Sequence, residues 1–217
     1  MAIDRMRLLL AAVLALVAVP VLAQIGFSES YSFLKAVRER DGAKVDSITS
    51  NPSSTVINAR DRDSGEGALH IVTRGRDLNW LVFLLARRAR PDIGTNDGTT
   101  PLMLAAQIGW RDGAEQLIAR GASVNASNSR GETPLMLAVQ RNDLPMVRLL
   151  LSQGADPNQT DNVSGNSAID YARQGGARST AILRTLEAPP PRPTQPGTTT
   201  APRPPTTPQT TPPATPR

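Results

Sequence analysis

The sequence predicts an all-α solenoid of about five helix-turn-helix units, and three observations indicate this fold class. Sequence landmarks recur every 33 residues through the middle of the chain, an interval typical of stacked helix-turn-helix repeats. Thr-Pro pairs stand where helices would begin, and Gly-Ala pairs stand where they would end. The chain has no Cys, so the stack must be stable through its apolar core without disulfides.

Two consecutive units carry the repeat in its clearest form. Residues 98–106 (GTTPLMLAA) recur 33 residues later as 131–139 (GETPLMLAV), and residues 121–125 (GASVN) recur as 154–158 (GADPN). A weaker copy lies one period earlier at 65–72 (GEGALHIV). Another lies at 165–172 (GNSAIDYA), where one residue has been inserted between units. The phase is otherwise kept.

Within a unit, each landmark has a physical role. Thr100 and Thr133 can accept hydrogen bonds from free N–H groups of a first helical turn, and the Pro that follows each has a preset φ. The first helix is short and apolar, with small Ala positions that permit close packing. Gly121 and Gly154 would end the second helices with a left-handed backbone. The apolar residues of one such second helix are spaced to bury one side, namely Met146, Val147, Leu149, Leu150 and Leu151.

The predicted repeat domain covers residues 24–187, with end units at about 28–60 and 160–187. End units need one wettable side. The first unit is predicted to bury Phe33, Leu34, Ala36, Val37, Val45 and Ile48, and the last Ala181, Ile182, Leu183 and Leu186. The second helix of the unit at Gly98 has Gly113, Ala114 and Gln116 where bulky residues are expected. We therefore predict that Trp80 and Phe83 of the preceding unit fill that space.

The two ends of the chain are excluded from the fold. Residues 1–23 combine Arg5 and Arg7, an apolar run and the exit Val21-Leu22-Ala23, which predicts a secretory signal cleaved before Gln24. The alternative is an uncleaved membrane anchor, although the apolar run is short for a membrane span. Residues 188–217 contain 12 Pro and 9 Thr and no aliphatic residue larger than Ala, which predicts a disordered, semi-stiff tail. The tail could act as a docking arm or as a solubilising extension.

The charge distribution argues against nucleic acid as the partner. The whole chain has a formal net charge of +5, but the signal and the tail carry most of that excess. Residues 24–187 contain 19 basic and 18 acidic residues, so the predicted folded domain is nearly neutral. Nucleic-acid binders concentrate basic charge on the folded domain.

No group of residues predicts catalysis, a cofactor or a metal. His70 is the only histidine, so a structural role is favoured over a catalytic or ligand role. Residues 61–66 (DRDSGE) resemble the start of a calcium loop, but the Gly comes one place early and Val72 holds the position of the closing Glu. A turn is the better interpretation. Arg87, Arg88 and Arg90 fall at the end of a second helix, where cations complement free carbonyls, with a patch for an acidic partner as the alternative.

The pattern Thr-Pro-Leu-x-x-Ala-Ala followed by Gly-Ala-x-x-Asn resembles the ankyrin repeat family over about residues 31–186. That resemblance implies a non-catalytic module that binds another protein through a concave surface. It also implies a structural hydrogen-bonding role for His70, although Gly67-Ala68 replaces the usual preceding pair. By the same resemblance, partners contact the turn tips and the exposed ends of the first helices, which here are Asp63, Ser64, Glu66, Arg74, Asn96, Asp97, Thr99, Gln107, Ile108, Ser129, Arg130, Glu132, Gln140 and Arg141.

Together, the predicted signal and the resemblance predict a monomeric protein that is periplasmic or secreted. We expect it to act as a scaffold, protector or inhibitor of another protein. We expect no stable membrane insertion after cleavage. The alternative is a structural envelope protein, whose Pro/Thr-rich tail engages the cell wall or a membrane complex while the repeats act as a spacer.

Overall fold

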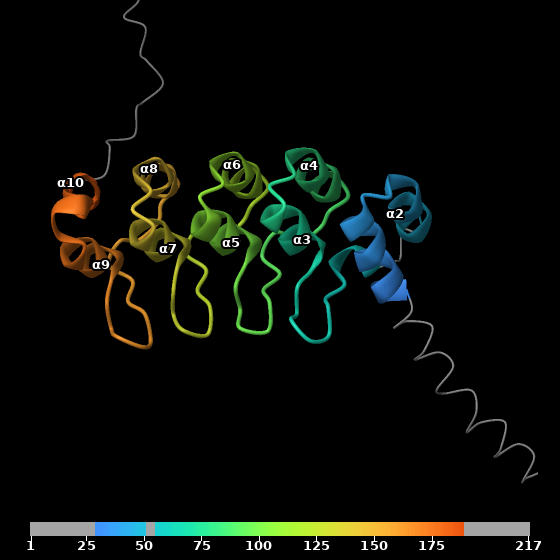
Figure 1. Cartoon of the computed structure of the whole chain (residues 1–217), viewed down its shortest axis with the longest axis horizontal. Helices are drawn as coiled ribbons and strands as arrows, with labels where there is room; N and C mark the ends of the chain where they lie inside the picture. The colour runs from blue at the N-terminus through green and yellow to red at the C-terminus, as the bar shows by residue number, and fades with distance from the viewer. Residues whose placement is uncertain (1–28, 51–54, 189–217) are drawn as a thin grey trace, which may run out of the picture.

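Pairs of short helices stand side by side in one row, and irregular loops project from one side of the row (Figure 1). The computed structural model describes residues 29–50 and 55–188. The predicted signal and all of the predicted tail except Ala188 lie outside these residues. The described part contains no strand, and its only β-type pairing is two isolated bridges, Arg60 to Gly67 and Thr160 to Ser167. The all-α solenoid is therefore confirmed.

Five helix pairs follow one another within residues 29–50 and 55–188. The first comprises a helix described over residues 29–39 and α2 (Gly42–Thr49), followed by the 3-10 turn η1 (Val56–Asn58). The next three are α3 (Ala68–Arg74) with α4 (Leu78–Ala86), α5 (Pro101–Ile108) with α6 (Arg111–Ala119), and α7 (Pro134–Gln140) with α8 (Leu144–Ser152). The last is α9 (Ala168–Gln174) and α10 (Thr180–Glu187), separated by the 3-10 turn η2 (Gly176–Ser179).

We call α3, α5, α7 and α9 the inner helices, because they lie beside the projecting loops, and α4, α6, α8 and α10 the outer helices (Figure 1). Each inner helix packs on the next inner helix and on the outer helix of its own pair. The loops are hairpin 1 (60–67), hairpin 2 (95–99), hairpin 3 (128–132) and hairpin 4 (160–167). Among the described residues no helix is long and apolar enough to cross a membrane.

The helix boundaries follow from the residues at the ends. Thr100 Oγ1 accepts from Met103 N and Thr133 Oγ1 from Met136 N, each at 3.3 Å, and a Pro follows each Thr as the first helical residue. Gly121 and Gly154 have φ values of +86° and +85°, a conformation that a side chain would strain. The predicted starts of α5 and α7 and the predicted ends of α6 and α8 are confirmed.

The core is continuous from the first helix pair to the last, because each pair covers its neighbour's apolar side. All residues of α5 from Pro101 to Ala106 are buried, as are those of α7 from Pro134 to Val139. In α8, Met146, Val147 and Leu150 are buried, while Leu149 and Leu151 are half-buried against them. In the end units the predicted burial is confirmed with three exceptions. Ile48 and Leu183 are half-buried, and Ala181 is exposed.

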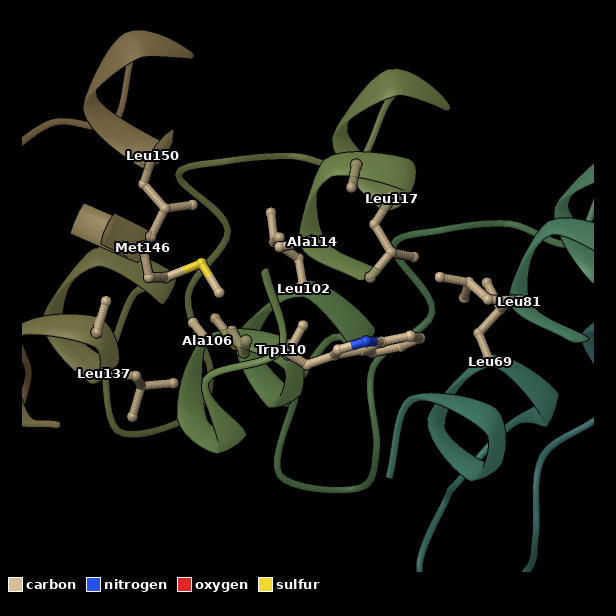
Figure 2. Packing of buried hydrophobic residues seen from close by; sticks show 14 of the residues in the cluster. Leu69, Leu81, Leu102, Ala106, Trp110, Ala114, Leu117, Leu137, Met146 and Leu150 are labelled. Atoms are coloured by element: carbon tan, nitrogen blue, oxygen red, sulfur yellow. The ribbon is translucent and has the colours of Figure 1, made fainter. Parts of the chain in front are cut away.

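The space beside Gly113 is filled by Trp110, so the prediction that Trp80 and Phe83 fill it is wrong. A Cβ on Gly113 would overlap the Trp110 indole. The indole is buried and extends from the α5–α6 pair toward Leu69 and Leu81 of the preceding pair (Figure 2). Trp80 and Phe83 instead contact each other, with ring centroids 4.9 Å apart. The missing volume is thus supplied by a neighbour on the same chain segment, three residues before the glycine.

Candidate protein-binding surface

The four hairpins hold their shape through short polar side chains that accept from their own backbone. Asn128 Oδ1 accepts from Arg130 N and from Glu132 N, both at 3.0 Å. Asp161 Oδ1 accepts from Val163 N at 2.8 Å and from Ser164 N at 2.6 Å, and the Tyr171 hydroxyl donates to Asp161 Oδ2 at 2.8 Å. Because these bonds satisfy the backbone N–H groups at the bends from within each hairpin, the tips do not need a partner to become ordered.

Backbone hydrogen bonds join each hairpin to the next. Asn96 N donates to Ser64 O at 3.0 Å, Ser129 N to Asp97 O at 2.7 Å, and Asn162 N to Arg130 O at 2.8 Å. We call this series the hairpin ladder. Its regular interval places the four tips in one line along the side of the helix row (Figure 1).

The glycines at the tips permit this close approach. Gly65, Gly98 and Gly131 have φ values of +73°, +82° and +76°. A Cβ on Gly65 would stand 2.5 Å from Asn96 N, and one on Gly131 would stand 2.6 Å from Asn162 N. A side chain at these positions would both strain the turn and displace the next hairpin.

His70 connects the second unit to the third. Its ring is buried, Nδ1 accepts from Gly67 N at 3.2 Å, and Nε2 lies 2.9 Å from Thr99 O in hairpin 2. Because Gly67 has no side chain to cap α3, the imidazole takes that role from inside the helix. Burial lowers the pKa of His70, so the neutral ring is the folded form. The structural interpretation of His70 is confirmed.

Most of the predicted contact residues at the hairpin tips are accessible. Asp63, Ser64, Asn96, Asp97, Ser129 and Arg130 are exposed, and Thr99 is half-buried. Glu66 is half-buried and pairs with Arg74. Glu132 is the exception, because it is only 8% exposed. Its carboxylate accepts from Asn128 Nδ2 at 2.9 Å and pairs with Arg130 at 3.3 Å, so its main contacts are inside hairpin 3 rather than on the predicted surface.

The predicted residues at the inner helix ends form a second line. Arg74, Gln107, Gln140 and Arg141 are exposed and Ile108 is half-buried. Two arginines cover the free carbonyls at the end of α5, since Arg76 donates to Ile108 O and Arg141 Nη1 to Gln107 O at 3.4 Å. A cation is favourable at a helix C-terminus, so these guanidinium groups bind neighbouring units to one another while remaining exposed.

The surface is hollowed at two places that include predicted residues. One hollow, of about 280 Å³, lies between hairpins 3 and 4 and is lined by Arg130, Glu132, Asp161, Val163, Ser164, Asn166 and Tyr171. A larger one, of about 520 Å³, lies beside the ends of α7 and α9 and is lined by Val139, Gln140, Arg141, Asn142, Tyr171, Gly175, Arg178 and Ser179. The sequence reasoning missed Val163, Tyr171 and Arg178. Gly175 and Gly176 stand in the connection from α9 to α10, which is longer than the connections inside the three preceding pairs, and they were the available sequence signal for the larger hollow.

Residues 61–66 form the tip of hairpin 1, so the interpretation as a turn is confirmed. Asp61 Oδ1 accepts from Asp63 N at 3.1 Å and from Ser64 N at 3.2 Å. These N–H groups, that of Ser64 first, lower the pKa of Asp61. The pKa of Asp161 in hairpin 4 is held below its usual range in the same way, chiefly by the Ser164 N–H. Within 29–50 and 55–188 no three His, Cys, Asp or Glu residues group as a metal site would require.

Of the three arginines after α4, Arg87 behaves as the helix-end interpretation predicts. Arg87 Nη1 donates to Phe83 O at 3.4 Å, and its guanidinium lies 3.5 Å from the Phe83 ring centroid. The same group pairs with Asp46 of the first unit. Arg87 is therefore engaged in holding α4 against α2.

The arrangement of inner helices, outer helices and projecting hairpins has a direct counterpart among known families. A family model described as ankyrin repeats (3 copies) matches the chain at residues 36–128, 68–161 and 112–186. Together these matches span residues 36–186, which is more than half of the 217-residue chain. Ankyrin repeats are generally protein–protein interaction modules rather than catalysts. This chain belongs to the ankyrin repeat family.

Proposed function

We propose that this protein binds a partner protein in the periplasm through its hairpin tips and the exposed ends of its inner helices, as a scaffold, protector or inhibitor. The observation that carries the proposal is the hairpin ladder. It fixes four tips in one line before any partner arrives, so little conformational entropy is lost on binding.

The chemistry of the exposed side chains favours a protein partner. Acidic, basic, amide and hydroxyl groups alternate along the tips, as in Asp63, Asn96, Asp97, Ser129 and Arg130. A mixed surface of this kind fits the polar rim of a protein interface better than a ligand of one charge sign. The two hollows beside α7 and between hairpins 3 and 4 give side chains of a partner places to enter.

Reversal of two exposed arginines tests the binding surface. In the doubly substituted chain Arg130→Glu, Arg141→Glu, we expect the yield of the partner captured from an envelope extract to fall at least about tenfold, which corresponds to about 1.4 kcal/mol of binding free energy. The matched control is Arg120→Glu, Arg148→Glu, which changes the same charge at exposed positions of the α6 and α8 region.

Equal loss in both variants would contradict a defined surface, as would the absence of any dominant partner at moderate salt. Circular dichroism of both variants must first show the wild-type helix content. Deletion of residues 188–217 provides the second arm. If localisation is lost while capture persists, the tail acts as an anchor and the repeats as a spacer.

The periplasmic location is tested separately. Cell fractionation with detection of the chain, and mass measurement of its N-terminus, should place the mature protein outside the inner membrane with Gln24 as its first residue. A chain that retains residues 1–23 would contradict cleavage.

A further inference from the structure

The larger hollow lies at the junction of the fourth and fifth helix pairs, beside the ends of α7 and α9 (Figure 1). Among the described residues that line it, Arg141 and Arg178 are cations and none is Asp or Glu. Val139 and Tyr171 add apolar surface to the same lining. Pockets of about 300–1,000 Å³ hold small-molecule ligands, so a hollow of about 520 Å³ has room for a side chain and the backbone beside it.

The connection from α9 to α10 leaves this junction open. Counted from the first residue of each inner helix, Gly175 after α9 holds the place of Arg141 after α7. Arg141 Nη1 reaches back to Gln107 O at the end of α5 at 3.4 Å, whereas Gly175 has no side chain that could reach α7. The connection is also longer, with residues 175–179 against residues 141–143. The end of α7 therefore lacks the covering that Arg141 gives to the end of α5.

Arg178 is a cation without a counter-ion in the part of the chain that the structure describes. It is exposed, and it makes no hydrogen bond or ion pair with residues 29–50 or 55–188. The acidic residues of α9 and α10 are Asp170 and Glu187, and both pair with Arg173, at 3.5 Å and 3.0 Å. The last helix pair thus offers no free carboxylate to Arg178.

Arg141 supplies the second positive charge. Its guanidinium group donates to a carbonyl of α5 and makes no ion pair with a described acidic side chain. Asp143, two residues further along, caps α8, because its Oδ1 accepts from Met146 N at 3.0 Å. The other oxygen of Asp143 faces Gly109 of the preceding unit. The positive charge at the hollow is therefore not neutralised by a bound carboxylate.

The buried end of the hollow is polar and uncharged. Ser179 is only 5% exposed, and its hydroxyl lies 3.4 Å from Asn142 Oδ1 across the junction. A Cβ on Gly175 would stand 2.2 Å from Ser179 Oγ, so the glycine leaves the hydroxyl its place. Hydroxyl and amide groups here are further donors for an anion.

The end of α7 opposes an anion only weakly. Unpaired carbonyls give a helix C-terminus a partial negative charge. The carbonyls of residues 137–139, however, accept from the N–H groups of residues 141–143. Two full positive charges at the hollow therefore outweigh the partial charge that remains.

We propose that this hollow binds an acidic peptide segment, with a Glu or Asp carboxylate paired to Arg178 and Arg141. Guanidinium and carboxylate groups form strong charge-assisted hydrogen bonds, and Val139 and Tyr171 contact the apolar stem of the bound side chain. The assignment of that segment to the partner protein rests on the proposed function, because Gln140 and Arg141 belong to the proposed contact surface.

The shape of the surface favours a peptide over a phosphate ion. A phosphate ion would occupy a small part of the hollow and leave its apolar lining uncovered. Tyr171 lines this hollow and also the one between hairpins 3 and 4. An extended segment that enters at Arg178 can therefore continue past Tyr171 toward the hairpin tips.

A titration with a short peptide tests the site without the partner. The full chain, labelled with ¹⁵N, is titrated with acetyl-Gly-Glu-Glu-Gly-amide at about 20 mM salt, where screening between charges is weak. We expect saturable changes in the amide chemical shifts of Gly175, Gly176 and Ser179. The matched peptide acetyl-Gly-Gln-Gln-Gly-amide has nearly the same shape without the charge, and it should leave these shifts unchanged.

One substitution identifies the cation. In Arg178→Gln, the Kd of the acidic peptide should rise at least about fivefold, because a charge-assisted hydrogen bond is lost. The matched control Arg184→Gln removes one charge from α10 outside the lining of the hollow, and it should change the Kd by less than about twofold. Both arginines are exposed, so circular dichroism should show the wild-type helix content in both variants.

Equal increases of the Kd in the two variants would overturn the proposal, as would shifts spread evenly over all exposed arginines. Inorganic phosphate that causes the same shifts at lower concentration would also overturn it, by assigning the hollow to a phosphate ligand. If the peptide binds as expected but no partner is captured from the envelope extract, the acidic-peptide site stands and the proposed function fails. If the peptide does not bind and Arg178→Gln captures the partner undiminished, the site alone fails.

Discussion

At the residue scale, His70 shows how one side chain replaces a missing one. Gly67 stands where Thr100 and Thr133 cap the next two inner helices, and it offers no oxygen. The His70 ring takes over by accepting from Gly67 N and contacting Thr99 O. The only histidine is thus explained by the loss of a Thr rather than by chemistry on a ligand.

This role makes stability depend on pH. Burial lowers the folded pKa of His70 below its ordinary value of 6.5, so the unfolded chain binds more protons between those two pKa values. The contribution of the neutral His70 ring to the free energy of unfolding should therefore be fully present above about pH 6.5. It should be lost as the pH falls through the folded pKa. Urea titrations at pH 7.5 and pH 5.5 measure the decline.

The matched variant is His70→Gln, which should be less stable at pH 7.5 by about 1–3 kcal/mol because buried hydrogen bonds are lost. It should no longer lose stability between pH 7.5 and pH 5.5. An unchanged decline in this variant would show that other groups cause it. Asp61, Asp97 and Asp161 titrate at lower pH, since backbone and hydroxyl donors depress their pKa values.

At the element scale, α6 depends on Trp110 in the turn before it. Gly113 and Ala114 leave the first turns of the helix with little apolar volume before the buried Leu117, and the indole lies in the resulting space. The short connection from α5 to α6 is thus part of the core.

Gly113→Ala should destabilise the protein although Ala favours helices over Gly. The added Cβ would overlap the Trp110 indole, and overpacking typically costs about 1–3 kcal/mol, which exceeds the propensity gain of about 1 kcal/mol. The control Gly42→Ala meets nothing within 4 Å and should be neutral or slightly stabilising. The midpoints of thermal unfolding of the two variants, each compared with the wild type, measure these effects on stability. Equal effects at the two positions would contradict the packing of Trp110.

At the scale of the whole molecule, each unit is stabilised only through its neighbours. Inner helices α5 and α7 are covered on both sides, while the first and last pairs each have one outer side on which the described residues supply no further pair. Stability in such a stack is the sum of unit terms and junction terms.

Amide hydrogen exchange should therefore be slowest in α5 and α7 and fastest in α2 and α10. Leu102→Ala, in the middle, should cost about 2–5 kcal/mol and lower protection in the units on both sides. Leu186→Ala, in α10, should lower protection mainly in α9 and α10. If both variants reduced protection equally throughout, the stack would unfold as a single unit.

The sequence predicted the repeat, the starts of α5 and α7 and the ends of α6 and α8, because Thr-Pro and Gly have local effects that do not depend on distant contacts. It failed at Gly113, since only the path of the chain shows that Trp110 comes back over α6. It also placed Glu132 on the surface, whereas Asn128 draws its carboxylate inward. Sequence spacing specifies which side of a helix a residue occupies, but not which neighbouring group becomes the hydrogen-bond partner of its polar atoms.

The ladder bonds recur between units with little change, and this has a genetic consequence. A segment such as residues 98–130 meets its neighbours through groups that reappear at 131–163. Duplication or loss of 33 codons within this stretch therefore produces junctions of a kind that already exist. The span available for recognition can grow or shrink in whole steps, without simultaneous changes elsewhere in the gene.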